Sequence, residues 1–135
     1  MPKLSGKLRV FVVDDEPTIA DTTTAILNRE GFEACAIYSG EHAVRMASVI
    51  RPHVLVCDVM MPGMNGIQTS MRIRQIVPDC RIILITGHTA AGDLLKRAKE
   101  TGFIFELLAK PIHPSVVLNC LKSLASDGQI TFGAL

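Results

Sequence analysis

Residues 53–58 read HVLVCD and run into VMMPGMNG at residues 59–66, so an apolar stretch ends at Asp58 and a loop rich in glycine and proline follows. A short, nearly continuous apolar run is typical of a strand that helices cover on both faces. Asp58 would then stand at the carboxyl end of a buried strand. In open α/β sheets this edge is where ligands bind, which makes Asp58 the first candidate for a functional residue.

Three further apolar stretches end in polar side chains. The stretch LRVFVV (8–13) is followed by Asp14 and Asp15, RIILI (81–85) by Thr86, and FELLA (105–109) by Lys110. If the strands are parallel, their carboxyl ends lie at the same edge of the sheet, and all these side chains meet there.

The apolar runs alternate with segments of helical character. The runs begin near residues 8, 33, 54, 81 and 104. The helices are expected from Pro17 to the stop at Gly31, over 40–50 with Ser39 as N-cap, over about 65–76, over 93–101, and from Pro114 to the stop at Asp127-Gly128. Strands that alternate with helices at this spacing predict an α/β fold with a parallel sheet.

Length and composition narrow the function classes. The chain has 135 residues, which fits one domain, and a formal net charge of +1, which argues against a strongly basic nucleic-acid binder. The four cysteines have no metal-ligand spacing, so we expect them to be reduced core residues. No apolar run approaches the length of about 20 residues that a membrane span needs, so we expect a soluble, cytoplasmic protein without membrane insertion.

The groups at the predicted edge suit phosphoryl chemistry. Three carboxylates close together, Asp14, Asp15 and Asp58, either raise a pKa or hold a cation. Oxygen ligands with room for water suit Mg²⁺, and Lys110 and Thr86 would complete a phosphoryl site in which one aspartate is the nucleophile. Each group alone also has a structural explanation as a helix cap, a turn residue or a solvated lysine. Their occurrence at the ends of different strands favours a site.

These motifs resemble the receiver domain of bacterial two-component response regulators. The resemblance is carried by VVDDE (12–16), DVMMPGMNG (58–66), Thr86-Gly87 and Lys110-Pro111, with intervals of 43 residues from Asp15 to Asp58, 28 to Thr86 and 24 to Lys110. It implies a flavodoxin-like, doubly wound sheet of five parallel strands in the order 2-1-3-4-5 with five helices. The receiver would cover residues 8–126, between a flexible N-terminus (1–7) and a short tail (127–135).

The resemblance also implies residue roles. Asp58 would accept a phosphoryl group from a phosphohistidine on a sensor histidine kinase or phosphotransfer protein. Lys110 would pair with Asp58 and then with the phosphoryl oxygens, and Thr86 would hydrogen-bond the phosphoryl group. The Mg²⁺ ligands would be Asp14, Asp15, Asp58 and the main-chain carbonyl of Met60.

The expected output is a change of surface. The face formed by the fourth helix, the fifth strand and the fifth helix would change shape and control a downstream effector protein, or the phosphoryl group would be relayed. We therefore expect a stand-alone switch that contacts no nucleic acid directly and is not an enzyme beyond its own phosphorylation and dephosphorylation. The family further implies a cis peptide bond between Lys110 and Pro111.

One position departs from the family pattern. The family often has Tyr or Phe three residues before the lysine, where this chain has Leu107. The Thr86 step needs only a hydroxyl and should survive, whereas the aromatic readout is in question. His88, two residues after Thr86, is a candidate to influence the water that removes the phosphoryl group.

Two alternatives belong to other functional classes. A phosphatase of the haloacid dehalogenase type also uses a strand-end Asp with Mg²⁺, but it has an Asp two residues after the nucleophile, where this chain has Met60. An adaptor that has the receiver fold but needs no phosphorylation is the other alternative. The complete set of acids, hydroxyl and lysine argues against it.

Overall fold

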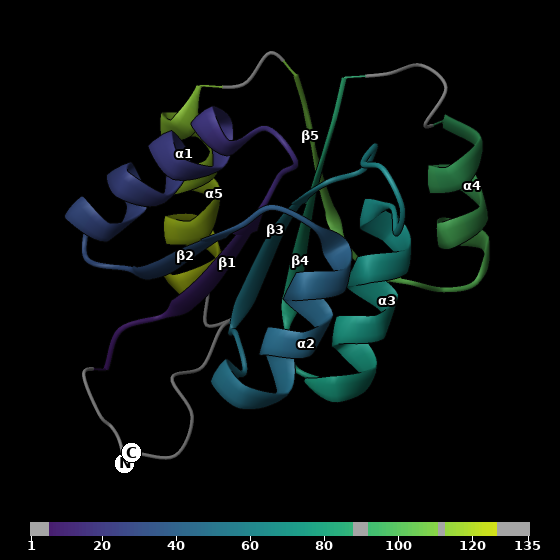
Figure 1. Cartoon of the computed structure of the whole chain (residues 1–135), viewed down its shortest axis with the longest axis horizontal. Helices are drawn as coiled ribbons and strands as arrows, with labels where there is room; N and C mark the ends of the chain where they lie inside the picture. Colours follow the sequence, from purple (N-terminus) through teal and green to yellow (C-terminus); the bar gives the residue numbers. More distant parts are fainter. Residues whose placement is uncertain (1–5, 88–91, 111–112, 127–135) are drawn as a thin grey trace.

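The computed structural model of the chain describes residues 6–87, 92–110 and 113–126, in which five strands alternate with five helices (Figure 1). The strands are β1 (Arg9–Val13), β2 (Glu33–Ile37), β3 (Val54–Asp58), β4 (Arg81–Thr86) and β5 (Glu106–Ala109). The helices are α1 (Pro17–Arg29), α2 (Gly40–Ile50), α3 (Gly66–Ile76), α4 (Gly92–Glu100) and α5 (Pro114–Ser126).

The five strands form one sheet in the order β2-β1-β3-β4-β5, and every strand pair is parallel. The predicted α/β fold with strand order 2-1-3-4-5 is therefore confirmed. Because all pairs are parallel, the strands end at one edge of the sheet, and β4 and β5 reach the top of Figure 1. No helix in the described ranges is long and apolar enough to cross a membrane.

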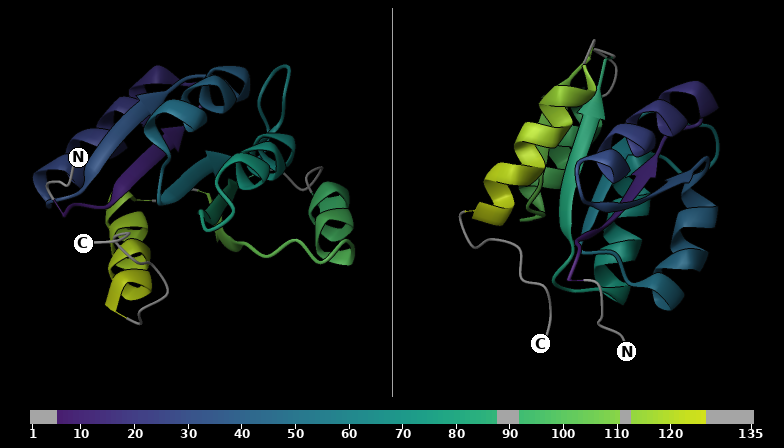
Figure 2. Two further views of the ribbon diagram at one scale, coloured as in Figure 1. Left: turned by 90° about the horizontal axis from the view of Figure 1, so that it is seen from below. Right: turned by 90° about the vertical axis from the view of Figure 1, so that its left-hand side faces the viewer.

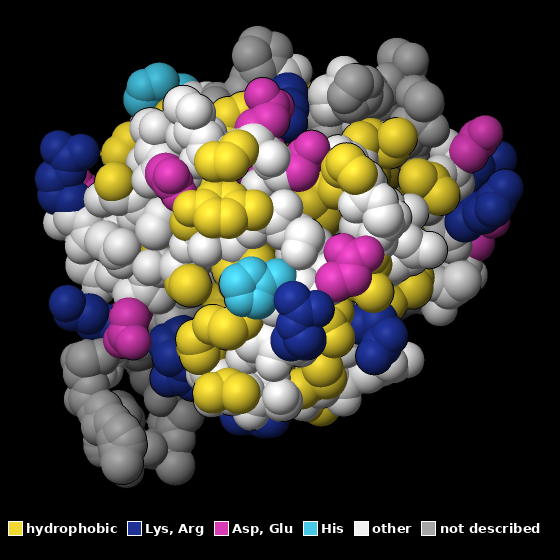
Figure 3. Space-filling model, viewed as in Figure 1, with side chains coloured by type: hydrophobic (Ala, Val, Ile, Leu, Met, Phe, Trp, Pro, Cys, Tyr) yellow, Lys and Arg dark blue, Asp and Glu magenta, His cyan; other side chains and the backbone are white. Residues whose placement is uncertain are grey.

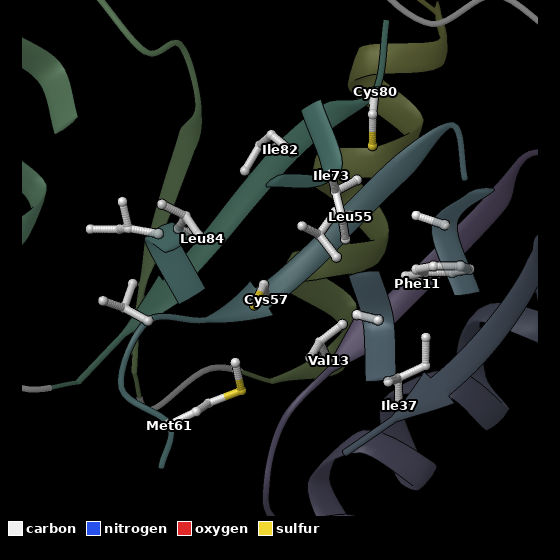
Figure 4. Packing of buried hydrophobic residues seen from close by; sticks show 14 of the residues in the cluster. Phe11, Val13, Ile37, Leu55, Cys57, Met61, Ile73, Cys80, Ile82 and Leu84 are labelled. Atoms are coloured by element: carbon white, nitrogen blue, oxygen red, sulfur yellow. The ribbon is translucent and has the colours of Figure 1, made fainter. Parts of the chain in front are cut away.

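The central strand β3 is buried along its whole length, as its apolar sequence predicts. Leu55 and Cys57 point into a core shared with α2, α3 and α4 (Figure 4), and Val54 and Val56 into a second core shared with α1 and α5. Figure 2 shows α5 on one side of the sheet and α2 and α3 on the other. Burial of one such aliphatic side chain contributes about 1.5–3 kcal/mol, and the two cores together hold Asp58 at a rigid strand end.

Side-chain caps fix where two helices begin. Ser39 Oγ accepts a hydrogen bond from the His42 amide at 3.2 Å, as expected for the N-cap of α2. Asn65 is the N-cap of α3, one residue before the helix, and forms a capping box with Gln68 in which both hydrogen bonds are 2.9 Å. Both caps lie next to the edge where the strands end.

The fifth strand begins later than the apolar run predicts, at Glu106 rather than near residue 104. The Arg74 guanidinium lies 4.9 Å from the centre of the Phe103 ring and donates to the Ile104 carbonyl at 3.0 Å. These contacts with α3 hold the segment before β5 outside the strand ladder.

Several expectations concern residues outside the described ranges. They are the flexibility of the N-terminus (1–7) over its first five residues, the role of His88, the cis bond to Pro111 and the short tail 127–135. All of them remain predictions.

Candidate functional site

The structure brings the predicted acidic residues together at the carboxyl edge of the sheet. Asp14 follows β1, and Asp58 is the last residue of β3. One carboxylate oxygen from each of Asp14, Asp15 and Asp58 lies within 4.8 Å of the others. Asp14 and Asp58 are buried, whereas Asp15 is exposed. Figure 3 shows acidic side chains at this upper edge of the molecule.

Lys110 reaches the same cluster from the end of β5. Its Nζ lies 3.3 Å from Asp58 Oδ1 and 3.9 Å from Asp14 Oδ2. The Lys110 amide donates to the Thr86 carbonyl at 2.8 Å, which ties the lysine to the end of β4. The lysine, the hydroxyl-bearing Thr86 and the acids thus occupy neighbouring strand ends, as the spacing predicts.

Asp14 is held by its backbone neighbours. Its amide donates to the Ile37 carbonyl at 3.1 Å, and its Oδ1 accepts from the Glu16 amide at 2.9 Å. The N-cap of α1 is Glu16, which makes no side-chain capping bond. The helix-cap explanation therefore fails for Asp15, whose carboxylate lies in the acidic cluster instead.

Burial raises the pKa of Asp58 above its ordinary value, because the charged form loses hydration, and the positive charge of Lys110 opposes this shift. Burial also raises the pKa of Asp14, while the hydrogen bond from the Glu16 amide and the positive charge of Lys110 lower it by less. Lys110 Nζ forms an ion pair with Asp58 Oδ1 at 3.3 Å. This buried oxygen has no hydrogen-bond partner within the described part of the chain.

Such a donor set fits a hard divalent cation. Two buried carboxylates and one exposed carboxylate converge, and among residues 6–87, 92–110 and 113–126 one of their buried oxygens, Asp58 Oδ1, has no hydrogen-bond partner. A cation would offset their mutual repulsion and satisfy that oxygen, and Mg²⁺ prefers oxygen ligands that leave room for water. Met60 lies in the loop directly after Asp58, next to the buried Met61, and the role of its carbonyl as a ligand stays a prediction.

Two glycines of the site were missed by sequence reasoning. A Cβ on Gly66 would lie 2.8 Å from Val59 Cα and still nearer to the Asp58 carbonyl oxygen. A Cβ on Gly87 would lie 2.9 Å from Lys110 Cβ. The motifs around Asp58 and Thr86 contain these glycines, but only the fold reveals what approaches them.

Leu107 occupies the position where the family often has an aromatic residue. It lies on β5 with 41% of its surface exposed, while Phe105, before the strand, packs against the core. Both side chains lie on the side of the sheet that α4 covers, since Leu107 lines a groove with Leu95 and Phe105 packs against the core that contains Leu95. Phe103 and Phe105 are both partly buried against this core, so within the described residues neither supplies the missing exposed aromatic side chain.

The fold and the acidic edge define a doubly wound α/β protein with a candidate divalent-cation site beside a lysine. The family model of the response regulator receiver domain matches residues 10–122, and the chain belongs to this family.

Related proteins agree with this assignment. The chain is 34% identical over 106 residues to the DNA-binding response regulator MtrA of Mycolicibacterium smegmatis, which covers 78% of the chain and 45% of that protein. It resembles the structure of a two component transcriptional regulator AraC from Clostridium phytofermentans ISDg, with TM-score 0.78, 31% identity and coverage of 89% and 94% of the two chains.

A second solved structure contains a metal ion. The response regulator TrrA from Thermotoga maritima, in complex with Mg²⁺-BeF, has TM-score 0.73 and 27% identity, with 87% of this chain and 98% of that one covered. The chain spans about half the length of the curated relatives that it matches.

Proposed function

We propose that this protein is a phosphorylation-driven switch in which Asp58 accepts a phosphoryl group from a phosphohistidine on a sensor kinase or phosphotransfer protein. The observation that carries the proposal is the buried Asp58 Oδ1, which has no hydrogen-bond partner in the described residues and lies 3.3 Å from Lys110 Nζ. Membership of the receiver family supports the same role.

The residues suggest how the transfer proceeds. An Asp58 carboxylate oxygen attacks phosphorus, and the new P–O bond forms as the P–N bond of the donor breaks. The electron pair returns to the donor imidazole, which takes a proton from solvent. Burial raises the pKa of Asp58, and a more basic carboxylate is a better nucleophile. Lys110 Nζ is close enough to Asp58 to form an ion pair with the oxygens of the transferred phosphoryl group.

Mg²⁺ is proposed as the cofactor. Its ligands would be Asp14, Asp15, Asp58 and the carbonyl of Met60, and when bound it would neutralise charge on the phosphoryl oxygens. The convergence of the three carboxylates supports this assignment, as does the Mg²⁺ in the complex of the similar protein TrrA.

The proposed output is the surface formed by α4, β5 and α5. A groove of about 540 Å³ lies between α4 and β5. Its lining combines apolar side chains, two lysines and one glutamate, from Gly92, Leu95, Lys96, Lys99, Glu100 and Leu107. Ile104, before β5, and Val116, on α5, are further exposed apolar side chains, by 67% and 42%. These features suit a contact with an effector protein.

The proposal includes no direct contact with nucleic acid by residues 1–135. Their formal net charge is only +1. MtrA is named a DNA-binding protein, but the chain covers only 45% of it. We also propose that the protein turns over no external substrate, since Met60 stands where the phosphatase alternative needs a second Asp.

The direct test is intact mass after incubation with Mg²⁺ and a small-molecule acyl-phosphate donor. We expect one added phosphoryl group on the wild type, and none when EDTA replaces Mg²⁺ or when Asp58→Asn replaces the wild type. Addition to Asp58→Asn would place the acceptor elsewhere. If the donor gives no addition, incubation with a phosphorylated histidine kinase decides, and no transfer there would refute the proposal. Steady hydrolysis of a phosphomonoester would revive the phosphatase alternative.

We further expect the wild type to switch although Leu107 replaces the aromatic residue. Thr86 needs only its hydroxyl to meet the phosphoryl group, so the phosphodonor should change the amide hydrogen exchange of residues 92–110. Leu107→Tyr should take up phosphoryl at an unchanged rate, because the replaced side chain is exposed and lines the outer groove. If only Leu107→Tyr shows the exchange response, the aromatic side chain is necessary for switching.

A further inference from the structure

The first turn of α2 reaches the loop that follows Asp58. Glu41 Oε2 accepts a hydrogen bond from the Met64 amide at 2.9 Å. The same oxygen would lie 2.7 Å from a Cβ on Gly63, whose φ of +72° is one that glycine adopts readily. The side chain therefore lies against the middle of the loop between β3 and α3, a segment to which neither Asp58 nor Lys110 belongs.

This loop is fixed at its two ends by main-chain hydrogen bonds. The Val59 amide donates to the Ile85 carbonyl at 2.9 Å, and the Gly66 amide donates back to the Val59 carbonyl at 2.8 Å. The residues between them include Met60, whose carbonyl is the proposed Mg²⁺ ligand. Glu41 adds a contact from a different helix within this stretch.

The first turn of α2, which carries Glu41, is itself held in place. The preceding Gly40 is so close to the buried Thr69 hydroxyl that a Cβ would clash with it, and that hydroxyl donates to the Asn65 carbonyl at 2.8 Å. Ser39 caps the N-terminus of this helix. The pKa of the exposed Glu41 carboxyl is lowered, chiefly by the hydrogen bond from Met64, so the carboxylate is charged at neutral pH.

We infer that Glu41 is a positioning residue for the metal site: through the Met64 amide it holds the β3–α3 loop in the conformation in which the Met60 carbonyl joins the three carboxylates. This inference rests on the proposed function. Glu41 touches neither the phosphoryl group nor the cation. Its effect on Mg²⁺ affinity is indirect. A loop that is already ordered before the cation binds avoids the entropic cost of ordering during binding.

The test separates hydrogen-bond reach from charge. Mg²⁺ binding is measured by titration calorimetry on the full chain in the wild type, Glu41→Ala, Glu41→Gln and Glu41→Asp. The carboxamide of Glu41→Gln keeps an acceptor at the same reach without the charge, whereas Glu41→Asp keeps the charge but is one methylene shorter.

We expect Glu41→Gln to bind Mg²⁺ with nearly the wild-type affinity. Glu41→Asp and Glu41→Ala should bind it about tenfold more weakly, as is usual when a residue that orients metal ligands is lost. Amide exchange at Met64 without Mg²⁺ should become faster in the same two variants. Such faster exchange together with weaker binding is the signature of a positioning role, since a residue that only stabilises the fold would leave the Mg²⁺ affinity unchanged.

Three results would overturn the inference. Equal affinity in all four proteins would show that the loop does not depend on Glu41. Wild-type affinity in Glu41→Asp with weak binding in Glu41→Gln would show that charge acts rather than reach. Failure of the wild type itself to bind Mg²⁺ would overturn the proposed metal site as well, so the two failures are distinguishable.

Discussion

Asp58→Asn is expected to fold, to take up no phosphoryl group at this position, and to be more stable than the wild type at pH 7 in the absence of Mg²⁺. The substitution keeps the shape of the side chain and removes a buried negative charge that lies close to two other carboxylates. Lys110 retains Asp14 as a partner at 3.9 Å. We expect a gain on the order of 1 kcal/mol, comparable to relieving one unsatisfied buried group.

The gain should depend on pH in a defined direction. Burial raises the pKa of Asp58 in the folded protein above the unfolded value of 3.8. At pH values between these two pKa values, the folded state therefore binds more protons than the unfolded state. The wild type therefore loses stability as pH rises through this range, while the variant has no such group. Their difference should be smallest below pH 3.8 and reach a plateau once Asp58 is fully ionised in the folded protein.

Thermal unfolding from acidic to neutral pH in EDTA measures this difference. A gain of 1 kcal/mol corresponds to a shift in Tm of about 4 °C for a domain of this size. Saturating Mg²⁺ should reverse the order, because the cation stabilises only the protein that binds it well. A variant that is less stable than the wild type at neutral pH without Mg²⁺ would contradict the repulsion between the carboxylates.

The site was predictable because its residues follow strands with strong local signals. The apolar runs before Asp14, Asp58 and Thr86 are buried β1, β3 and β4 in the structure. In a parallel sheet the ends of such strands must meet, so sequence position alone determined which polar groups come together.

What the sequence did not predict depends on contacts between distant segments. The hydrogen bond from Met64 to Glu41 spans 23 residues, and no local preference encodes it. Arg74 meets Ile104 across 30 residues and keeps the segment before β5 out of the sheet, which moved the start of that strand to Glu106. An exposed Glu and a helical Arg have ordinary solvated roles in most proteins, so their roles emerge only from the fold.

The close approach of α3 to the end of β3 is another such contact, and it places Gly66 against the backbone of the proposed phosphoryl acceptor. A Cβ at this position would lie 2.9 Å from the Asp58 carbonyl carbon and 2.8 Å from Val59 Cα. Backbone atoms of a buried strand do not rotate away as the end of a side chain does. The clash must therefore displace either the first turn of α3 or Asp58 itself.

Gly66→Ala is thus expected to lower the free energy of unfolding by about 3 kcal/mol, at the upper end of the usual cost of overpacking. The better helix propensity of alanine, about 1 kcal/mol, does not offset this clash.

Gly92→Ala is the matched control, because a Cβ at this first residue of α4 meets nothing within 4 Å. The free energy of unfolding of this variant should change by less than about 0.5 kcal/mol. Chemical denaturation of both variants measures the difference, and Mg²⁺ affinity should fall only in Gly66→Ala, since only that substitution moves a proposed ligand. Equal stability of the two variants would show that the loop after Asp58 yields, and that its geometry is not what fixes the acceptor.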